Sequence, residues 1–208
     1  MIALIDSGIC NLASVTNALS RVGARVEVAH TPEGLRGASA IILPGVGAFA
    51  DGMQSLRDRG FVEPLRQAGK AAKPILGICL GMQLLVEESE EHGRHEGLGL
   101  LPGRARRMTA DQAGFRVPNI GWCDVAAAHP GKLYPQAGAA GSFYFVHSYY
   151  VETGPAHVAA TIEFSGRKLA AAVERGALCG VQFHPEKSQE CGLDLLARWV
   201  GSLPGAGR

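Results

Sequence analysis

A cysteine stands between two glycines in the segment Gly77–Gly81, which reads GICLG. The apolar run 74–78 predicts a short buried strand, and residues 82–88 predict a helix. Cys79 at such a strand-to-helix turn has the geometry of a nucleophile elbow, with sulfur in place of the serine oxygen. The helix N-terminus favours the thiolate, and the backbone N–H of Leu80 is placed to stabilise an oxyanion. The spacing therefore predicts a covalent nucleophile, although cysteine is also a common small buried hydrophobe.

A histidine and a glutamate follow another apolar segment far downstream. Residues 177–183 predict a buried strand, and His184 and Glu186 come directly after it. In an extended chain the side chains of residues i and i+2 point to the same face, and Pro185 between them restricts the backbone. The carboxylate can then hold the imidazole in one tautomer while the other ring nitrogen faces a thiol. Together with Cys79, these residues predict a Cys/His/Glu nucleophilic triad.

The paired motifs resemble the triad of class-I glutamine amidotransferase domains, which use Cys, His and Glu in this order. Four further stretches resemble one branch, the glutaminase subunit of imidazole glycerol phosphate synthase. They are LPGVGAF at 43–49, EGLGLLPG at 96–103, VPNIGW at 117–122 and FYFVHSYY at 143–150. The resemblance spans essentially the whole chain. It implies that the chain hydrolyses L-glutamine to glutamate and ammonia, and it implies no cofactor and no metal.

The resemblance also assigns roles to residues outside the triad. Val46 and Gly47, in a glycine-rich loop after a predicted strand, become candidates for the second oxyanion donor beside Leu80. Without the resemblance, this loop is equally well read as an ordinary turn. The residues expected to bind glutamine are Gly47, Gln83, Ser148 and Tyr149. Taken alone, Gln83 would be a solvated helix position, and His147 is expected to be a hydrogen-bonded structural histidine.

The sequence offers no site for a nucleotide or for an ammonia acceptor. Because a free glutaminase would waste glutamine, the resemblance implies a (β/α)8-barrel cyclase subunit that receives the ammonia in a heterodimer. The complex would form imidazole glycerol phosphate and the aminoimidazole carboxamide ribonucleotide in histidine biosynthesis. The residues expected near this interface are Pro118, Ile120, Trp122, Tyr144 and Lys187. In the same region Asn119 stands where the family commonly has histidine, and Cys123 where it commonly has asparagine, which bears on subunit coupling.

Composition narrows the classes of protein and partner. The chain has 208 residues and a formal net charge of +1. Its acidic and basic residues are interspersed, so neither nucleic acid nor a membrane surface is an expected partner. One domain, 1–208, is expected, with no membrane span and no signal peptide. Five scattered cysteines without C-x-x-C spacing predict neither a disulfide framework nor a metal site, and they favour a cytoplasmic location.

The order of predicted elements places these motifs at one edge of a sheet. Strands at 2–5, 25–29, 40–43 and 74–78 alternate with helices at 11–22, 49–57 and 61–69, and a further helix start is expected at 31–33. This order predicts a flavodoxin-like open mixed sheet in an α/β fold, mostly parallel, with helices on both faces. The site is then expected at the carboxyl ends of the strands.

The second half is expected to be rich in β-structure. Short strands are predicted at 104–109, 120–127, 142–146, 157–164, 169–174 and 178–183, before a final helix at 194–200. Loops are expected at 92–96 and 130–141, where the sequence is polar and rich in glycine. At the end of the first strand, Asp6 is expected to cap a helix rather than to act as an acid.

Three alternatives remain open at this stage. Another amidotransferase branch, such as the pyridoxal phosphate synthase glutaminase, keeps the triad but changes the partner, and the 143–150 stretch argues against it. A redox- or peroxide-sensing α/β protein keeps a reactive elbow cysteine but does not need the His184/Glu186 pair. A catalytically silent binding subunit would lack a member of the triad, and none is missing here.

Overall fold

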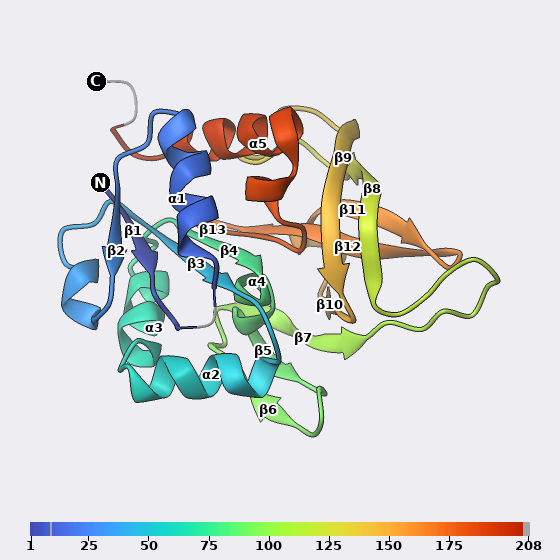
Figure 1. The fold of residues 1–208 in the computed structure, drawn as a ribbon, viewed down its shortest axis with the longest axis horizontal. Helices are drawn as coiled ribbons and strands as arrows, with labels where there is room; N and C mark the ends of the chain where they lie inside the picture. The colour runs from blue at the N-terminus through green and yellow to red at the C-terminus, as the bar shows by residue number, and fades with distance from the viewer. Residues whose placement is uncertain (9, 206–208) are drawn as a thin grey trace.

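The computed structural model describes residues 1–8 and 10–205, and its ribbon is shown in Figure 1. Within this part of the chain, nine strands form one sheet in the order β2-β1-β3-β4-β13-β12-β11-β8-β9. The parallel half consists of β1 (Ile2–Ile5), β2 (Val26–Ala29), β3 (Ala40–Gly45), β4 (Ile75–Cys79) and β13 (Leu178–Val181). The antiparallel half consists of β8 (Asn119–Ala127), β9 (Gly138–His147), β11 (Val158–Phe164) and β12 (Arg167–Arg175). The predicted α/β class, with a parallel core and a β-rich second half, is confirmed.

Helices cover both faces of the parallel half (Figure 1). The helices α1 (Leu12–Arg21) and α5 (Gln189–Gly201) lie on one face, and α2 (Phe49–Asp58) and α3 (Val62–Lys70) lie on the other. The surroundings of strand β3 explain why its sequence is apolar throughout. Ile42 packs into the core under α1 and α5, whereas Ile41 and Leu43 pack into the core under α2 and α3. A strand buried on both faces needs an apolar side chain at every position.

A smaller sheet packs beside the main one and corrects two sequence expectations. It has the order β10-β7-β5-β6, with β5 (Val86–Ser89), β6 (His95–Glu96), β7 (Leu101–Arg107) and β10 (Tyr149–Glu152). The helix predicted over 82–88 is wrong in its second half, because α4 (Leu80–Leu84) ends and β5 begins at Val86. The segment 98–101 returns to donate its N–H groups to the carbonyls of Leu84, Leu85 and Val86, so long-range pairing replaces the next helical turn.

Other local expectations are also corrected. The predicted helix start at 31–33 is a short 3₁₀ turn, η1 (Pro32–Leu35), and two more such turns are η2 (Pro155–His157) and η3 (Pro185–Lys187). The loops expected at 92–96 and 130–141 contain β6 and the start of β9. Asp6 does not cap a helix. Its carboxylate accepts from the N–H of Gly8 at 2.8 Å, while Asn11 caps α1 by accepting from Ser14 at 3.3 Å.

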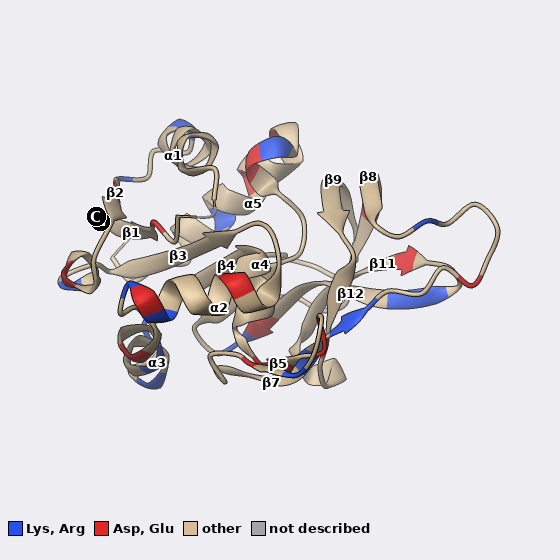
Figure 2. Cartoon of the chain, turned by 60° about the horizontal axis from the view of Figure 1, so that its bottom comes forward, with Lys and Arg blue, Asp and Glu red and all other residues tan. Residues whose placement is uncertain are grey.

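Charged residues of both signs are spread over helices and strands of both halves (Figure 2). This distribution agrees with the interspersed acidic and basic residues of the sequence. Among the described residues, none of the helices has the length and apolar character required to cross a bilayer.

Candidate active site

Cys79 is the last residue of β4 and stands directly before α4. Its backbone adopts φ +55° and ψ −111°, a conformation that side chains other than glycine rarely take. The flanking glycines permit this turn. A Cβ on Gly81 would collide with the carbonyl oxygen of Leu43 on β3, and one on Gly77 would lie 2.7 Å from the backbone of Gly81. The turn therefore packs strand against helix closely and presents the cysteine at the carboxyl edge of the sheet.

His184 and Glu186 form a buried pair after β13. His184 Nδ1 lies 2.8 Å from Glu186 Oε1, and the two side chains are only 4% and 3% exposed. Because a carboxylate accepts hydrogen bonds, Nδ1 carries a proton and Nε2 is the nitrogen left for another partner. Nε2 is buried and makes no hydrogen bond with the part of the chain that the structure describes. The imidazole is thus held by one nitrogen and free at the other.

Parallel pairing of β4 with β13 brings the two motifs together. The register places Val181 opposite Ile78, so that the next residues along each strand, Gln182 and Cys79, also lie side by side. Burial alone would lower the pKa of His184, but interactions with Cys79 in its thiolate form and with the Glu186 carboxylate outweigh burial and raise this pKa to about 9. The environment therefore favours the imidazolium near neutral pH and suits a thiolate–imidazolium pair.

A cavity of about 270 Å³ opens over Cys79 and His184. Its wall contains every residue predicted to bind glutamine or to supply an oxyanion donor: Val46, Gly47, Leu80, Gln83, Ser148 and Tyr149. Gly47 has φ +93°, which glycine adopts without strain. Gly45 at the end of β3 pairs with Cys79, so the loop that begins at Val46 lies next to the elbow. The structure thus brings together residues from four separate parts of the sequence.

Gln83 differs from the expectation of a solvated helix position, because it is only 5% exposed. Its Nε2 donates to the carbonyl of Tyr149 and to Oε1 of Gln182, each at 3.0 Å. Both hydrogens of this amide are therefore used within the protein. Only Oε1 of Gln83 is left to meet a molecule in the cavity, and it can only accept a hydrogen bond.

Two residues of the site were missed from the sequence, Glu91 and Gln182. Glu91 lines the cavity, and its Oε2 accepts from the N–H of Phe49 at the start of α2, at 2.7 Å. Gln182 is completely buried, and its Nε2 lies 3.8 Å from Cys79 Sγ. Neither residue has a local motif, because its partner is far away in the sequence. The position of Gln182 two residues before His184 was the one available signal, since it shares that residue's face.

His147 behaves as the structural histidine that was expected. Its Nδ1 donates to the carbonyl of Tyr149 at 2.9 Å, and its Nε2 accepts from Asn119 Nδ2 at 3.2 Å. Burial lowers the pKa of His147 to about 4. The hydrogen bond to Tyr149 raises this pKa, whereas the nearby His184 lowers it further. The ring is therefore neutral, and its tautomer is set by the Tyr149 carbonyl. Asn119 in turn contacts Cys123, so the two departures from the family pattern touch each other.

The five residues expected at a partner interface lie just before β8, on β8 and β9, and in the turn η3. Ile120 and Trp122 are 61% and 48% exposed on β8, and Pro118 lines the cavity itself. The rings of Trp122 and Tyr144 pack edge to face at 6.1 Å, and Lys187 Nζ lies 5.9 Å from the centre of the Tyr144 ring. Val46, Ile120, Trp122 and Val146 are the exposed large apolar residues of this region, and we call them the apolar rim.

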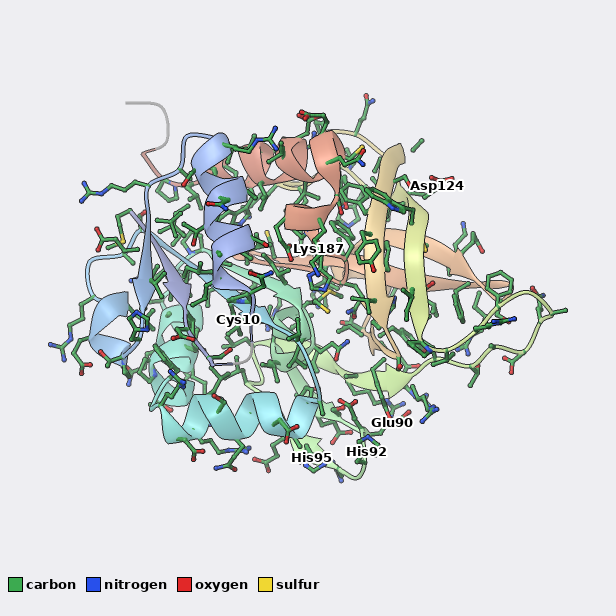
Figure 3. The ribbon with its side chains drawn as sticks, in the orientation of Figure 1. Cys10, Glu90, His92, His95, Asp124 and Lys187 are labelled. Carbon is green, nitrogen blue, oxygen red and sulfur yellow. The ribbon has the colours of Figure 1, made fainter. Side chains whose placement is uncertain are left out.

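A smaller cavity also borders two members of the triad, His184 and Glu186. It measures about 20 Å³ and is lined by His184 and Glu186 together with Cys10, Val46 and Lys187, among others. Figure 3 labels Cys10 and Lys187 in this region. His184 therefore borders both cavities, and the smaller one also contains Lys187, a residue expected at the partner interface.

Comparison with known families gives a match over almost the whole chain. The family described as glutamine amidotransferase class-I matches residues 3–199. The chain belongs to this family. This class-I glutamine amidotransferase is also 46% identical, over 94% of its length and 91% of the relative's, to the imidazole glycerol phosphate synthase subunit HisH of Moorella thermoacetica. It is 44% identical, over 100% of its length and 99% of the relative's, to the same subunit of a Geobacillus species. The amidotransferase is therefore a member of the HisH family.

Solved structures agree on the fold of this amidotransferase. A glutamine amidotransferase crystal structure superposes with a TM-score of 0.73 at 20% identity, covering 95% of this chain and 99% of the other. A chain of PurLQS from Thermotoga maritima superposes with a TM-score of 0.74 at 18% identity, covering 96% and 97%. At such identities the likeness establishes the fold alone. The HisH relatives favour this branch over the pyridoxal phosphate synthase branch, and the family membership argues against a redox sensor.

Proposed function

We propose that this amidotransferase hydrolyses L-glutamine through Cys79, His184 and Glu186 and delivers ammonia to a cyclase partner. The observation that carries the proposal is that the elbow cysteine and His184, whose Nδ1 is held by buried Glu186, line one cavity. The same three residue types in the same order are the ones that resemble the family's triad. A geometric convergence of nucleophile, base and orienting carboxylate is what acyl transfer requires.

Acylation begins from the thiolate–imidazolium pair that the raised pKa of His184 favours. The Cys79 sulfur attacks the side-chain amide carbon of glutamine, and the carbonyl electron pair moves onto oxygen. Backbone N–H groups of Leu80 and of the Val46–Gly47 loop are proposed to stabilise that oxyanion. His184 then gives its Nε2 proton to the amide nitrogen, the C–N bond breaks, and ammonia leaves a thioester on Cys79.

Hydrolysis of the thioester uses the same imidazole in the opposite direction. Neutral His184 takes a proton from water, whose oxygen attacks the thioester carbon. A second oxyanion forms and collapses, the C–S bond breaks, and glutamate leaves. The thiolate and the imidazolium are thereby restored. Throughout, Glu186 holds Nδ1 at 2.8 Å and stabilises the positive charge of the ring.

Recognition of glutamine is proposed to rest on the polar groups of the cavity wall. Glu91 supplies a carboxylate that suits the α-ammonium group, and its contact with α2 holds it in place. Ser148 and Tyr149 supply contacts to the α-amino and α-carboxylate groups, as the family resemblance implies. Gln83 offers an acceptor because its amide hydrogens are already used. Gly47 allows the substrate to approach the backbone closely.

The partner is proposed to be a (β/α)8-barrel cyclase subunit that converts the ammonia into imidazole glycerol phosphate. The name of the HisH relatives describes them as one subunit of a synthase, which supports a complex. The apolar rim beside the cavity is a suitable surface, because exposed apolar side chains that cluster around a site mark interaction surfaces. Pro118, Ile120, Trp122, Tyr144 and Lys187 are the proposed contacts. A cytoplasmic location also remains a prediction.

A glutaminase assay tests both parts of the proposal. Glutamate release is measured at saturating glutamine for the chain alone, for the chain with a candidate barrel subunit, and for that complex with its nucleotide substrate. The expected result is slow release alone and faster release in the complete mixture. Cys79→Ala, measured alongside, should abolish release while leaving the fold and partner binding intact. Equal rates with and without the partner would refute the proposed coupling to a cyclase. Activity in Cys79→Ala would refute the assignment of Cys79 as the nucleophile.

A further inference from the structure

Gln182 is a buried polar residue that the proposed chemistry does not use. It is completely buried, it follows the last residue of β13, and the parallel register with β4 carries it beside Cys79. Its Nε2 lies 3.8 Å from Cys79 Sγ, within hydrogen-bond distance for sulfur. Among the described residues, this is the one hydrogen bond that reaches the sulfur with suitable geometry. His184 Nε2, the proposed proton carrier, makes no well-aligned hydrogen bond to the sulfur, although Cys79 is near enough to raise the pKa of the ring.

The direction of the Gln182 amide follows from the groups behind it. The carbonyl of Tyr149 can only accept, and it receives His147 Nδ1 at 2.9 Å and Gln83 Nε2 at 3.0 Å. Gln83 must therefore turn its NH₂ group inward, and the second hydrogen reaches Gln182 Oε1 at 3.0 Å. Gln182 is left with its own NH₂ group facing Cys79. The two ends of a glutamine amide look alike, but this chain of bonds determines which end meets the sulfur.

We propose that Gln182 is a positioning residue for the nucleophile, which donates a hydrogen bond to Cys79 Sγ, holds the sulfur at the cavity wall and stabilises the thiolate. This inference rests on the proposed role of Cys79. A thiolate needs donors because it accepts hydrogen bonds more strongly than a thiol. An amide is suited to the task because it does not titrate near neutral pH, so it donates a hydrogen bond without exchanging protons in competition with His184. Gln182 thus positions the sulfur by a hydrogen bond, and His184 transfers the proton.

Two substitutions at this position separate donation from packing. Gln182→Met keeps a buried side chain of similar length but removes both the donor to Cys79 and the acceptor for Gln83. Gln182→Glu keeps the acceptor for Gln83 but places a carboxylate beside the sulfur, where it opposes the thiolate. A matched control is Leu178→Met, a change of similar volume on the same strand at the end far from Cys79. Circular dichroism and thermal unfolding report whether each variant folds.

The decisive measurement is the pH dependence of Cys79 alkylation by a glutamine-mimicking chloroketone, followed by peptide mapping. In Gln182→Met the midpoint of the alkylation profile should move to higher pH by about one unit. A hydrogen bond to a charged group changes an ionisation constant by about tenfold, and this variant loses that bond to the thiolate. In Gln182→Glu the midpoint should move further. The kcat for glutamine should fall by about tenfold in Gln182→Met, with a smaller change in KM. Leu178→Met should match wild type.

Two outcomes would overturn the inference. One is a wild-type midpoint in folded Gln182→Met, and the other is a kcat that falls only with the folded fraction. If neither variant folds, nuclear magnetic resonance of the wild type answers the question. The side-chain NH₂ resonance of Gln182 should then titrate with the thiol and lose that titration in Cys79→Ala, whereas a resonance independent of pH refutes the bond. Glutamine hydrolysis by Cys79→Ala would instead refute the proposed function itself.

Discussion

At the scale of single residues, the spacing of Cys79, His184 and Glu186 carried most of the chemical information. A thiol at an elbow and a His-x-Glu segment after a strand can be recognised in one sequence because each motif is local. Glu91 and Gln182 could not be recognised in this way. Their significance comes from Phe49 and Cys79, which lie far from them in the sequence and near them in space.

The first prediction separates the roles of His184 and Glu186. His184→Ala removes acid and base together and should cost nearly as much activity as the loss of Cys79. Glu186→Gln removes an orienting charge that touches only Nδ1, so it should be less harmful by roughly 2 kcal/mol in the barrier. Single-turnover acylation rates, measured for both variants with the partner bound, check this. A Glu186→Gln enzyme as inactive as His184→Ala, or as active as wild type, would contradict the assigned role.

The second prediction concerns the buried neutral ring of His147. Its folded pKa is about 4, below the ordinary value of 6.5, so the unfolded chain binds a proton first as the pH falls. The stability due to its neutral form is fully present above pH 6.5 and is lost as the pH falls towards about 4. Between about pH 7 and pH 5, the folded state should lose about 2 kcal/mol from this residue.

His147→Gln provides the comparison, because an amide can donate to Tyr149 and accept from Asn119 but does not titrate in this range. Urea unfolding of both proteins at the two pH values gives the free energies. The difference between wild type and His147→Gln should shrink by about 2 kcal/mol on acidification. A difference that does not depend on pH would mean that His147 is not buried as a neutral ring.

At the scale of elements, the alternation of strands and helices in the first half was predictable, since every crossover segment is local. The end of helix α4 was not predictable, because it depends on N–H groups donated from residues 98–101. The order of the antiparallel strands likewise could not be predicted from the sequence. Pairing β11 with both β8 and β12 is a choice among distant segments with similar alternating patterns.

A third prediction tests the close contact between α4 and β3. Gly81→Ala would place a methyl group against the backbone carbonyl of Leu43, which cannot move without disturbing the sheet. We expect a loss of several kcal/mol in stability, or failure to fold. Gly201→Ala is the matched control in α5, where a Cβ meets nothing within 4 Å. That variant should be neutral or more stable by up to about 1 kcal/mol, as judged from chemical unfolding.

At the scale of the whole molecule, the site and the apolar rim lie at the same region of the surface. Val46 and Val146 belong to both the rim and the cavity wall, and Ile120 is paired with Val146 across β8 and β9. A partner seated on the rim would therefore also cover the mouth of the cavity. The sequence alone could suggest these contacts through the family resemblance, but the fact that they surround the cavity required the fold.

The last prediction tests that arrangement. Ile120→Glu puts a charge on a side chain that is 61% exposed and has no place in the proposed chemistry, so folding and unstimulated glutamine hydrolysis should stay at wild-type values. Binding to the barrel subunit should weaken by about tenfold or more, because a charge would be desolvated in an apolar contact. Titration calorimetry and the stimulated glutaminase rate measure both effects. Val28→Glu is the matched control, since Val28 is also an exposed apolar residue, 36% accessible, but lies on β2 at the opposite edge of the sheet. Weakening by Val28→Glu and not by Ile120→Glu would place the partner on the other edge of the sheet and separate it from the cavity.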